Sequence, residues 1–282
     1  MAEYNPSDDA KKCYDLAVEA KRERGDAHWP ERLPYRRKEV IGDCTLYLGD
    51  CMEIMPTLGA VDTILTDPPF SERTHKGHDA GTGRDGAMRR QLGYSALTSS
   101  DIGPISDRLS AICSGWICWI TDHTLAPSIE AELRRNGRYV FAPLPFYQPG
   151  RSVRLTGDGP CSWTDWIIAS RTSAQIKWGT LPGGYVAGEG WKSKDRMGGK
   201  PVPLMTSMVR DYSSDGQTVL DPFMGAGTTL VACAKLGRRA VGIEIDEAIF
   251  DIACDRIRKA YAQPDMFVQT TPVAQPKQEP LL

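Results

Sequence analysis

The segment Thr218–Glu244 constrains the fold more than any other stretch of this 282-residue chain. It begins with an apolar run that predicts a buried strand, and it continues through two glycines, Gly225 and Gly227. A helix is predicted from Thr229 to Leu236, closed by a glycine cap, and Arg239–Glu244 predicts a second strand that ends in an acid. Such a strand–helix–strand unit indicates an α/β fold with a parallel sheet.

The glycine turn of this unit indicates a ligand site. Gly225 and Gly227 let the backbone approach a ligand closely, and the amino end of the following helix favours a negative group. Glu244 stands where an acid after the second strand accepts hydrogen bonds from two ribose hydroxyls. The spacing is GxGxxL, with Leu230 in place of a third glycine, and this argues against a nicotinamide or flavin cofactor.

A second motif follows another predicted buried strand, Val61–Leu65. The tetrapeptide Asp67–Phe70 comes directly after it, and its two prolines hold Asp67 and Pro68 in an extended conformation. The Asp67 carboxylate and the Pro68 carbonyl are then two fixed acceptors beside the flat ring of Phe70, which suits a planar base with an exocyclic amino group. The alternative is an ordinary strand-to-loop turn that the prolines only stiffen.

The two motifs together resemble the amino-methylating DNA methyltransferases of the permuted type, in which the catalytic motif precedes the cofactor motif. The resemblance spans about Val40 to Ala260 and rests on separated motifs in the family's order: Leu48–Cys51, Asp67–Phe70, Lys200–Pro201, Asp221–Thr229 and Gly242–Asp246, followed by Ala253 and Arg256. It implies a doubly wound, Rossmann-like α/β sheet with helices on both faces. It also implies S-adenosyl-L-methionine as cofactor and DNA as partner.

The resemblance assigns roles to individual residues. The catalytic residues are Asp67, Pro68, Pro69 and Phe70, and the cofactor-binding residues are Asp50, Lys200, Asp221, Pro222, Phe223, Gly225, Gly227, Thr228 and Glu244. Asp50 would help to hold the adenine of the cofactor, and it is equally well placed to cap the helix that follows it. Lys200 opens a helix that flanks the methionine end of the cofactor, although the polar residue that often precedes it in the family is Gly199 here.

The expected reaction is transfer of a methyl group to adenine N6 of a base flipped out of the DNA helix. Asp at the first position of the catalytic motif is more typical of adenine enzymes in the family, whereas Ser is more usual in cytosine enzymes. Cytosine N4 is the alternative target. A DNA-binding regulator with an idle cofactor fold is the alternative from another class, and the intact acceptor pair Asp67–Pro68 argues against it.

The bulk properties limit the other possibilities. The net charge is only −2, so a DNA surface must be local. Eight cysteines without a CxxC pair or a histidine cluster make a metal site unexpected, and no apolar run approaches membrane length. The expectation is a cytoplasmic protein with reduced thiols and no metal. The sequence leaves the oligomeric state open, a homodimer included.

Three parts are expected along the chain: a charged N-terminal appendage (1–39), a single methyltransferase domain (40–262) and a disordered tail (263–282). Residues 1–39 carry nine acidic and nine basic side chains, and a DNA-contacting arm at Arg36–Lys38 is a less favoured role for them. Further predicted elements are strands at Thr45–Leu48, Gly115–Ile120, Tyr139–Ala142 and Trp166–Ser170, and helices at Cys51–Leu58, around Leu125–Leu133, at Pro201–Tyr212 and at Glu247–Ala260. The last helix is expected to bury Ile249, Ile252, Ala253, Ile257 and Ala260.

Two insertions of the domain carry local positive charge. The loop 71–95 has five basic and three acidic residues, and the region 151–199 corresponds to the interval where the family places its target-recognition region. The predicted DNA-contacting residues are Arg73, Lys76, Arg84, Arg89, Arg90, Lys192, Lys194 and Arg196.

The tail contains a further resemblance. Gln263–Phe267 is similar to the short peptide by which bacterial replication and repair proteins dock on the DNA sliding clamp. Met266 and Phe267 would enter an apolar groove, and Gln263 would fix the register. The alternative is that both apolar residues fold back on the domain.

Overall fold

The computed structural model describes residues 33–74, 96–151, 159–173, 180–188 and 199–262. Within these residues the strands form one ten-stranded sheet in the order β1-β2-β10-β9-β3-β4-β7-β6-β8, with β5 paired to β7. The strands are β1 (Arg37–Ile41), β2 (Cys44–Leu48), β3 (Val61–Thr66), β4 (Cys113–Thr121), β5 (Tyr139–Val140), β6 (Leu144–Tyr147), β7 (Thr164–Arg171), β8 (Tyr185–Val186), β9 (Thr218–Asp221) and β10 (Arg239–Glu244).

The central five strands, β2, β10, β9, β3 and β4, run parallel to one another. The flanking strands β1 and β7 are antiparallel to their neighbours β2 and β4. The predicted glycine unit and the strand before the tetrapeptide are direct neighbours, because β9 pairs with β3 (Thr63 opposite Val219, Ile64 opposite Leu220). Parallel pairing brings the carboxyl ends of β3 and β9 to the same edge of the sheet.

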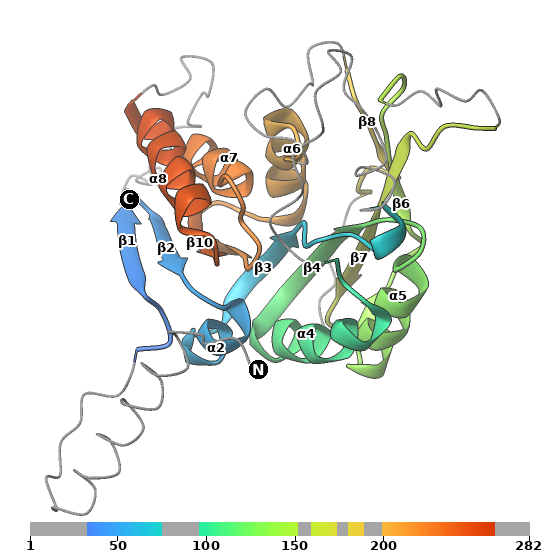
Figure 1. The fold of residues 1–282 in the computed structure, drawn as a ribbon, viewed down its shortest axis with the longest axis horizontal. Coiled ribbons are helices and arrows are strands. Elements are labelled where there is room, and N and C mark those ends of the chain that lie inside the picture. The colour runs from blue at the N-terminus through green and yellow to red at the C-terminus, as the bar shows by residue number, and fades with distance from the viewer. Residues whose placement is uncertain (1–32, 75–95, 152–158, 174–179, 189–198, 263–282) are drawn as a thin grey trace, which may run out of the picture. The chain divides into compact units, whose positions relative to one another are not determined.

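Helices cover both faces of this sheet (Figure 1). One face carries α2 (Cys51–Ile54), α4 (Ser99–Ile112) and α5 (Ala126–Arg135), and the other carries α6 (Val202–Tyr212), α7 (Thr228–Leu236) and α8 (Glu247–Ala262). Each set of helices packs on the sheet through its own cluster of buried apolar side chains. The predicted three-layer α/β fold is confirmed.

Several predicted elements agree closely with the structure. The predicted and observed bounds of β10 are the same, and β3 and α7 each differ from prediction by one residue at one end. Gly237 closes α7 in the left-handed conformation with φ +68°, as expected of a C-cap. The helix predicted around Leu125–Leu133 is α5, and it buries Ile129 and Leu133 together with its N-cap residue Leu125.

Other predicted bounds were wrong. The expected helix from Cys51 ends at Ile54 and passes into a 3₁₀ turn, Met55–Thr57, with Pro56 at its start. In α8 the predicted stripe is wrong at Ile252, which is 44% exposed, because Phe250, Ala253, Cys254 and Ile257 form the buried i, i+3, i+4, i+7 row instead.

One helix had no counterpart among the predicted elements. Helix α4 was not predicted because it contains Gly103 and Pro104, two residues that normally interrupt helices. Two signals mark it nevertheless. Asp101 accepts a hydrogen bond from the backbone N–H of Thr98 at 2.8 Å, which forms a capping box, and Ile102, Ile105 and Leu109 are buried at helical spacing.

The predicted domain boundaries also cross the sheet. The boundary at residue 39 falls inside β1, which pairs with β2, so the sheet begins before residue 40. The predicted recognition interval 151–199 contains β7 and β8, so part of it belongs to the sheet. The assignments of 71–95 to a DNA loop and of 263–282 to a disordered tail fall almost wholly outside the described residues and stay predictions.

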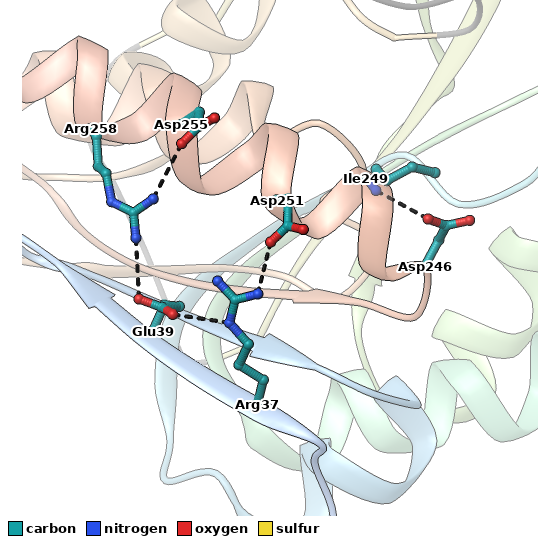
Figure 2. A network of polar contacts seen from close by, with 7 residues as sticks. All are labelled: Arg37, Glu39, Asp246, Ile249, Asp251, Asp255 and Arg258. Carbon is teal, nitrogen blue, oxygen red and sulfur yellow. Dashed lines mark hydrogen bonds and ion pairs between the residues drawn. The ribbon is translucent and has the colours of Figure 1, made fainter.

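Polar contacts join the edge strand β1 to α8 (Figure 2). The Arg37 guanidinium binds Glu39 at 3.0 Å and Asp251 at 2.8 Å, and Arg258 binds Glu39 at 3.3 Å and Asp255 at 3.2 Å. Arg37 therefore anchors a helix, which leaves little support for a DNA-contacting arm at this position. Asp246 caps α8, accepting a hydrogen bond from the Ile249 N–H at 3.0 Å.

Candidate active site

A pocket of about 280 Å³ opens at the carboxyl ends of β3, β9 and β10. Its wall contains all but one of the predicted catalytic and cofactor-binding residues: Asp50, Asp67, Pro68, Pro69, Phe70, Lys200, Asp221, Pro222, Phe223, Gly225, Thr228 and Glu244. The exception is Gly227, the N-cap residue of α7, which adopts the left-handed conformation with φ +76°. Motifs far apart in the sequence thus share one cavity.

The Asp67 carboxylate forms an ion pair with Lys200. The Lys200 ammonium donates to both carboxylate oxygens, at 2.7 Å to Oδ1 and 2.9 Å to Oδ2. The Asp67 side chain is 20% exposed and the Lys200 side chain is 8% exposed, so the pair is largely shielded from water. Burial raises the pKa of Asp67 above its ordinary value, although the Lys200 charge opposes this shift. The sequence predicted that Lys200 would flank the cofactor; the structure places its ammonium on the Asp67 carboxylate.

Lys200 also lies against an acid that sequence reasoning missed. Its ammonium is 3.5 Å from Oδ2 of Asp165, the second residue of β7. Asp165 in turn accepts from Gln148 Nε2 at 3.1 Å and is bound by the Arg151 guanidinium, which lines the pocket. Burial alone would lower the pKa of Lys200, but Asp67 and Asp165 together raise it above its ordinary value.

The segment after the tetrapeptide is held by Asp122, at the end of β4. Its Oδ2 accepts from the Ser71 N–H at 3.0 Å, the Ser71 hydroxyl and the Thr74 hydroxyl at 2.6 Å. Its Oδ1 accepts from the N–H groups of Thr124 and Leu125, just before α5. Burial would raise the pKa of Asp122, but these hydroxyl donors outweigh burial and lower it. Asp122 thereby fixes the chain on the far side of Phe70.

The floor of the pocket is built around Asp221. Its Oδ1 accepts from the Phe223 N–H at 3.1 Å, and its Oδ2 accepts from the Thr229 hydroxyl. Burial raises the pKa of Asp221 to about 7, although the Thr229 hydroxyl opposes this shift. Asp221 therefore shapes the glycine turn from inside, joining the end of β9 to the first turn of α7.

The close packing of α7 on the sheet explains the departure from the dinucleotide fingerprint. Leu230 is fully buried and lies over Gly242 of β10, where an added Cβ would come within 2.8 Å of the Leu230 side chain. It would also come within 2.4 Å of the Met224 sulfur. Gly242 thus gives the helix the close approach that a third glycine in the turn gives in a dinucleotide-binding fold.

Glu244 and Asp50 face the pocket from adjacent strand ends. The Glu244 Oε1 accepts from the N–H groups of Ile245 at 2.9 Å and Asp246 at 2.8 Å, which fixes the side chain. The Gly49 N–H donates to the Glu244 carbonyl at 2.9 Å and ties the two ends together. Asp50 caps α2 through the Met52 N–H at 2.8 Å, so the capping role considered for it is confirmed.

Of the predicted DNA-contacting residues, the structure describes only Arg73, which is exposed and adjoins the pocket residue Thr74. The others fall in 75–95 and 189–198, outside the described residues: Lys76, Arg84, Arg89, Arg90, Lys192, Lys194 and Arg196. Within the described part of the chain, no group of three or more His, Cys, Asp or Glu residues is placed to hold a metal ion. No helix in that part has the length and apolar character needed to cross a membrane.

Comparison with known proteins agrees with this architecture. Residues 184–255 match the family model described as DNA methylase. The type II methyltransferase M.HindIII of Haemophilus influenzae is 41% identical over 58 residues, which are 21% of this chain and 19% of that enzyme. The putative methylase YubD of Escherichia coli is 28% identical over 209 residues, 71% of this chain and 83% of that protein. The matched segment thus spans only about a fifth of the length of M.HindIII.

Solved structures extend the likeness to the whole sheet. The complex of M1.HpyAVI with SAM superposes with a TM-score of 0.59 at 20% identity and covers 76% of this chain and 98% of that one. The PvuII DNA methyltransferase, described as cytosine-N4-specific, gives 0.60 at 12% identity, with coverage of 81% and 95%. At these identities the likeness concerns the fold. The chain thus has the fold of these DNA methyltransferases, and its residues 184–255 match the model of the DNA methylase family.

Proposed function

We propose that this protein is an S-adenosylmethionine-dependent DNA methyltransferase that methylates the exocyclic amino group of a flipped-out base, with adenine N6 as the target. The observation that carries the proposal is the placement of Asp67 beside the glycine turn. Asp67 directly follows β3 and Asp221 is the last residue of β9, the neighbouring parallel strand, and both residues line one pocket. A hydrogen-bond acceptor for an amino group therefore faces a site built to hold a nucleoside.

The residues present fit the cofactor. Gly225 and Gly227 adopt positive φ values of 52° and 76°, which keep the turn close to the pocket, and the turn leads into the amino end of α7. Glu244, fixed by two backbone N–H groups, is oriented to accept from the ribose hydroxyls, and Asp50 lies beside it for the adenine. When bound there, S-adenosylmethionine supplies the methyl group as an activated sulfonium.

The chemical work of the chain is to orient the target. The Asp67 carboxylate and the Pro68 carbonyl accept the two N–H bonds of the amino group, which turns the nitrogen lone pair out of conjugation with the ring. Phe70, 9% exposed, supplies an apolar wall for the base. Alignment of the reacting atoms at about 3–3.5 Å supplies much of the rate in such reactions. The base must leave the DNA stack to reach this pocket.

DNA binding is proposed for the basic residues predicted from the sequence. Arg73 is exposed beside the pocket and is the described member of that set. Its partners would bind phosphates on either side of the flipped base, so affinity should fall steeply with salt. The clamp-docking peptide Gln263, Met266 and Phe267 lies outside the described residues and stays a prediction, as does the oligomeric state.

The experiment that tests this function is transfer of a labelled methyl group to DNA. Wild-type protein is expected to label unmethylated genomic DNA, and Asp67→Ala is expected to lose at least about tenfold in turnover, because one charge-assisted hydrogen bond contributes about 1.5–3 kcal/mol. Asp255→Ala is the matched control, since Asp255 is exposed on α8 outside the pocket. Turnover of Asp67→Ala above a tenth of wild type would refute the proposed role of Asp67.

The same experiment separates the alternatives. Mass spectrometry of the digested DNA distinguishes N6-methyladenine from N4-methylcytosine, the product expected if the chain acts like the cytosine-N4-specific PvuII enzyme that shares its fold. Salt-dependent DNA binding without transfer by the wild type would instead favour a regulator that uses the methyltransferase fold only to bind.

A further inference from the structure

A chain of alternating charges runs from the pocket wall into the protein: Asp67, Lys200, Asp165 and Arg151. Asp67, Lys200 and Arg151 line the pocket, and Asp165 lies behind them. We propose that Lys200 is a positioning residue that orients the Asp67 carboxylate as an acceptor for the substrate amino group, and that Asp165 and Arg151 hold Lys200 in place. The proposal deepens the function proposed above and rests on it. It moves Lys200 from the cofactor, where the sequence had placed it, to the catalytic motif.

The geometry of the pair suits orientation. The Lys200 ammonium lies 2.7 and 2.9 Å from the two Asp67 oxygens, so it bridges the carboxylate and fixes its plane. A carboxylate offers about four lone-pair sites, and Lys200 uses one on each oxygen. The remaining lone pairs stay available to accept an N–H bond. The ammonium also lies 4.5 Å from the centroid of the Phe70 ring, which joins the two side chains of the motif through one cation.

Lys200 is held from its other side. Its third N–H bond is left for Asp165, whose Oδ2 is 3.5 Å away. The Asp165 side chain is 5% exposed and is fixed by Gln148 and Arg151, so it cannot turn toward solvent without breaking both contacts. The Lys200 ammonium thus contacts two carboxylates: that of Asp67, which lines the pocket, and that of Asp165, which holds the ammonium from the other side.

The charges that face Asp67 explain why a cation is needed there. They are Lys200 before α6, Asp165 on β7, Arg151 after β6 and Asp221 at the end of β9. Burial and the Asp165 charge both favour the protonated form of Asp67, and Lys200 opposes them most strongly. A protonated carboxyl would donate from one oxygen and compete with the amino group. Lys200 therefore favours the ionised, hydrogen-bond-accepting form of Asp67.

The test compares Lys200→Met, which removes the charge from a side chain of similar length, with Lys200→Arg, which keeps the charge. Lys200→Met is expected to lower kcat about tenfold or more at neutral pH and to shift the acid limb of the kcat profile to higher pH. Lys200→Arg should keep the acid limb near that of the wild type. Cofactor affinity, measured by calorimetry, should change by less than about threefold in both variants.

A loss confined to cofactor affinity in Lys200→Met, with kcat and its pH profile unchanged, would overturn the proposal and return Lys200 to the cofactor. Asp165→Asn provides a second variant in which the Lys200–Asp67 pair remains. Because the Asp165 charge favours protonation of Asp67, its removal should shift the acid limb to lower pH. An acid limb that stays in place or moves to higher pH would contradict the proposed sharing.

A readout without catalysis separates this proposal from the proposed function. Carbon-13 NMR titration of the Asp side-chain carboxyl groups, with the Asp67 resonance assigned by its loss in Asp67→Asn, follows Asp67 without cofactor or DNA. The Asp67 pKa should rise in Lys200→Met and fall in Asp165→Asn. Unchanged titration in both variants would refute the proposal even if the wild type methylates DNA. The expected shifts in a protein that methylates no DNA would leave the pairing intact and reject the function.

Discussion

Glu244 offers the sharpest test of the proposed cofactor site, because its side chain is fixed before any ligand arrives. Its Oε1 accepts from two successive backbone N–H groups, at 2.9 Å from Ile245 and 2.8 Å from Asp246, and the residue lines the pocket. A carboxylate held in this way has paid the entropy of ordering in the free protein, so its hydrogen bonds to a ligand count nearly in full.

Two substitutions at this position remove different parts of the arrangement. Glu244→Gln keeps an oxygen for the two backbone N–H groups but replaces the other oxygen with an amide that donates. Glu244→Ala removes both acceptors. Hydrogen bonds to a charged group contribute about 1.5–3 kcal/mol, so the loss of the ribose contact should weaken S-adenosylmethionine binding by about 10- to 150-fold. The alanine variant should also unfold at a lower temperature, because the N–H groups before α8 lose their acceptor.

Isothermal titration calorimetry on the purified variants measures this loss directly, and thermal unfolding measures the change in stability. Glu247→Gln is the matched control, since Glu247 lies three residues further along, is exposed and is outside the pocket wall. The reasoning predicts weaker binding in both Glu244 variants and unchanged binding in the control. A dissociation constant for Glu244→Gln equal to that of the wild type would place the ribose elsewhere.

Three further predictions concern stability. Gly227→Ala should destabilise the fold by about 1–2 kcal/mol in urea, because φ is +76° and an added Cβ would lie 3.1 Å from Ala253; Gly237→Ala, with φ +68° and open space, controls for strain alone. Burial raises the Asp221 pKa from 3.8 to about 7, so between these two pH values the folded state holds a proton that the unfolded state releases, and stability falls as pH rises from about 4 to 7. In Asp221→Asn the urea midpoint should depend less on pH over this range. Arg37→Ala should lower the melting temperature slightly at low salt and less at high salt, since its ion pairs are partly exposed; a salt-independent loss would contradict this.

Much of the fold could be predicted because its centre consists of contiguous apolar runs. The strands β3, β9 and β10 are buried segments bounded by acids, glycines or prolines, and each is readable within its own few residues. The short strands β6 and β8 at one end of the sheet were missed, since Leu144–Tyr147 contains a proline and Tyr185–Val186 is only two residues long. Such strands form because they pair with a neighbouring strand, and this pairing cannot be read from their own few residues.

The candidate site divides in the same way. Its contiguous parts, the tetrapeptide after β3 and the glycine turn after β9, were visible as motifs, and the structure brings them into one pocket. The partner of Asp67 was not visible, because Lys200 is 133 residues away and the two meet only through the assembled sheet. Its motif could be recognised, but the target of its ammonium could not.

Asp165 shows why a search for acids at the carboxyl ends of strands finds only part of such a site. Strand β7 runs antiparallel to β4, with Trp166 opposite Thr121, so the amino end of β7 lies beside the carboxyl end of β4. Asp165 therefore reaches the ligand edge from the beginning of its strand, close to where Asp122 reaches it from the end of β4. In a mixed sheet the residues that face the ligand come from the ends of parallel strands and from the starts of antiparallel ones, and strand direction cannot be read from an isolated apolar run. The position of Asp165 thus depends on the topology of the sheet, whereas Asp67 belongs to a motif that can be recognised in a few consecutive residues.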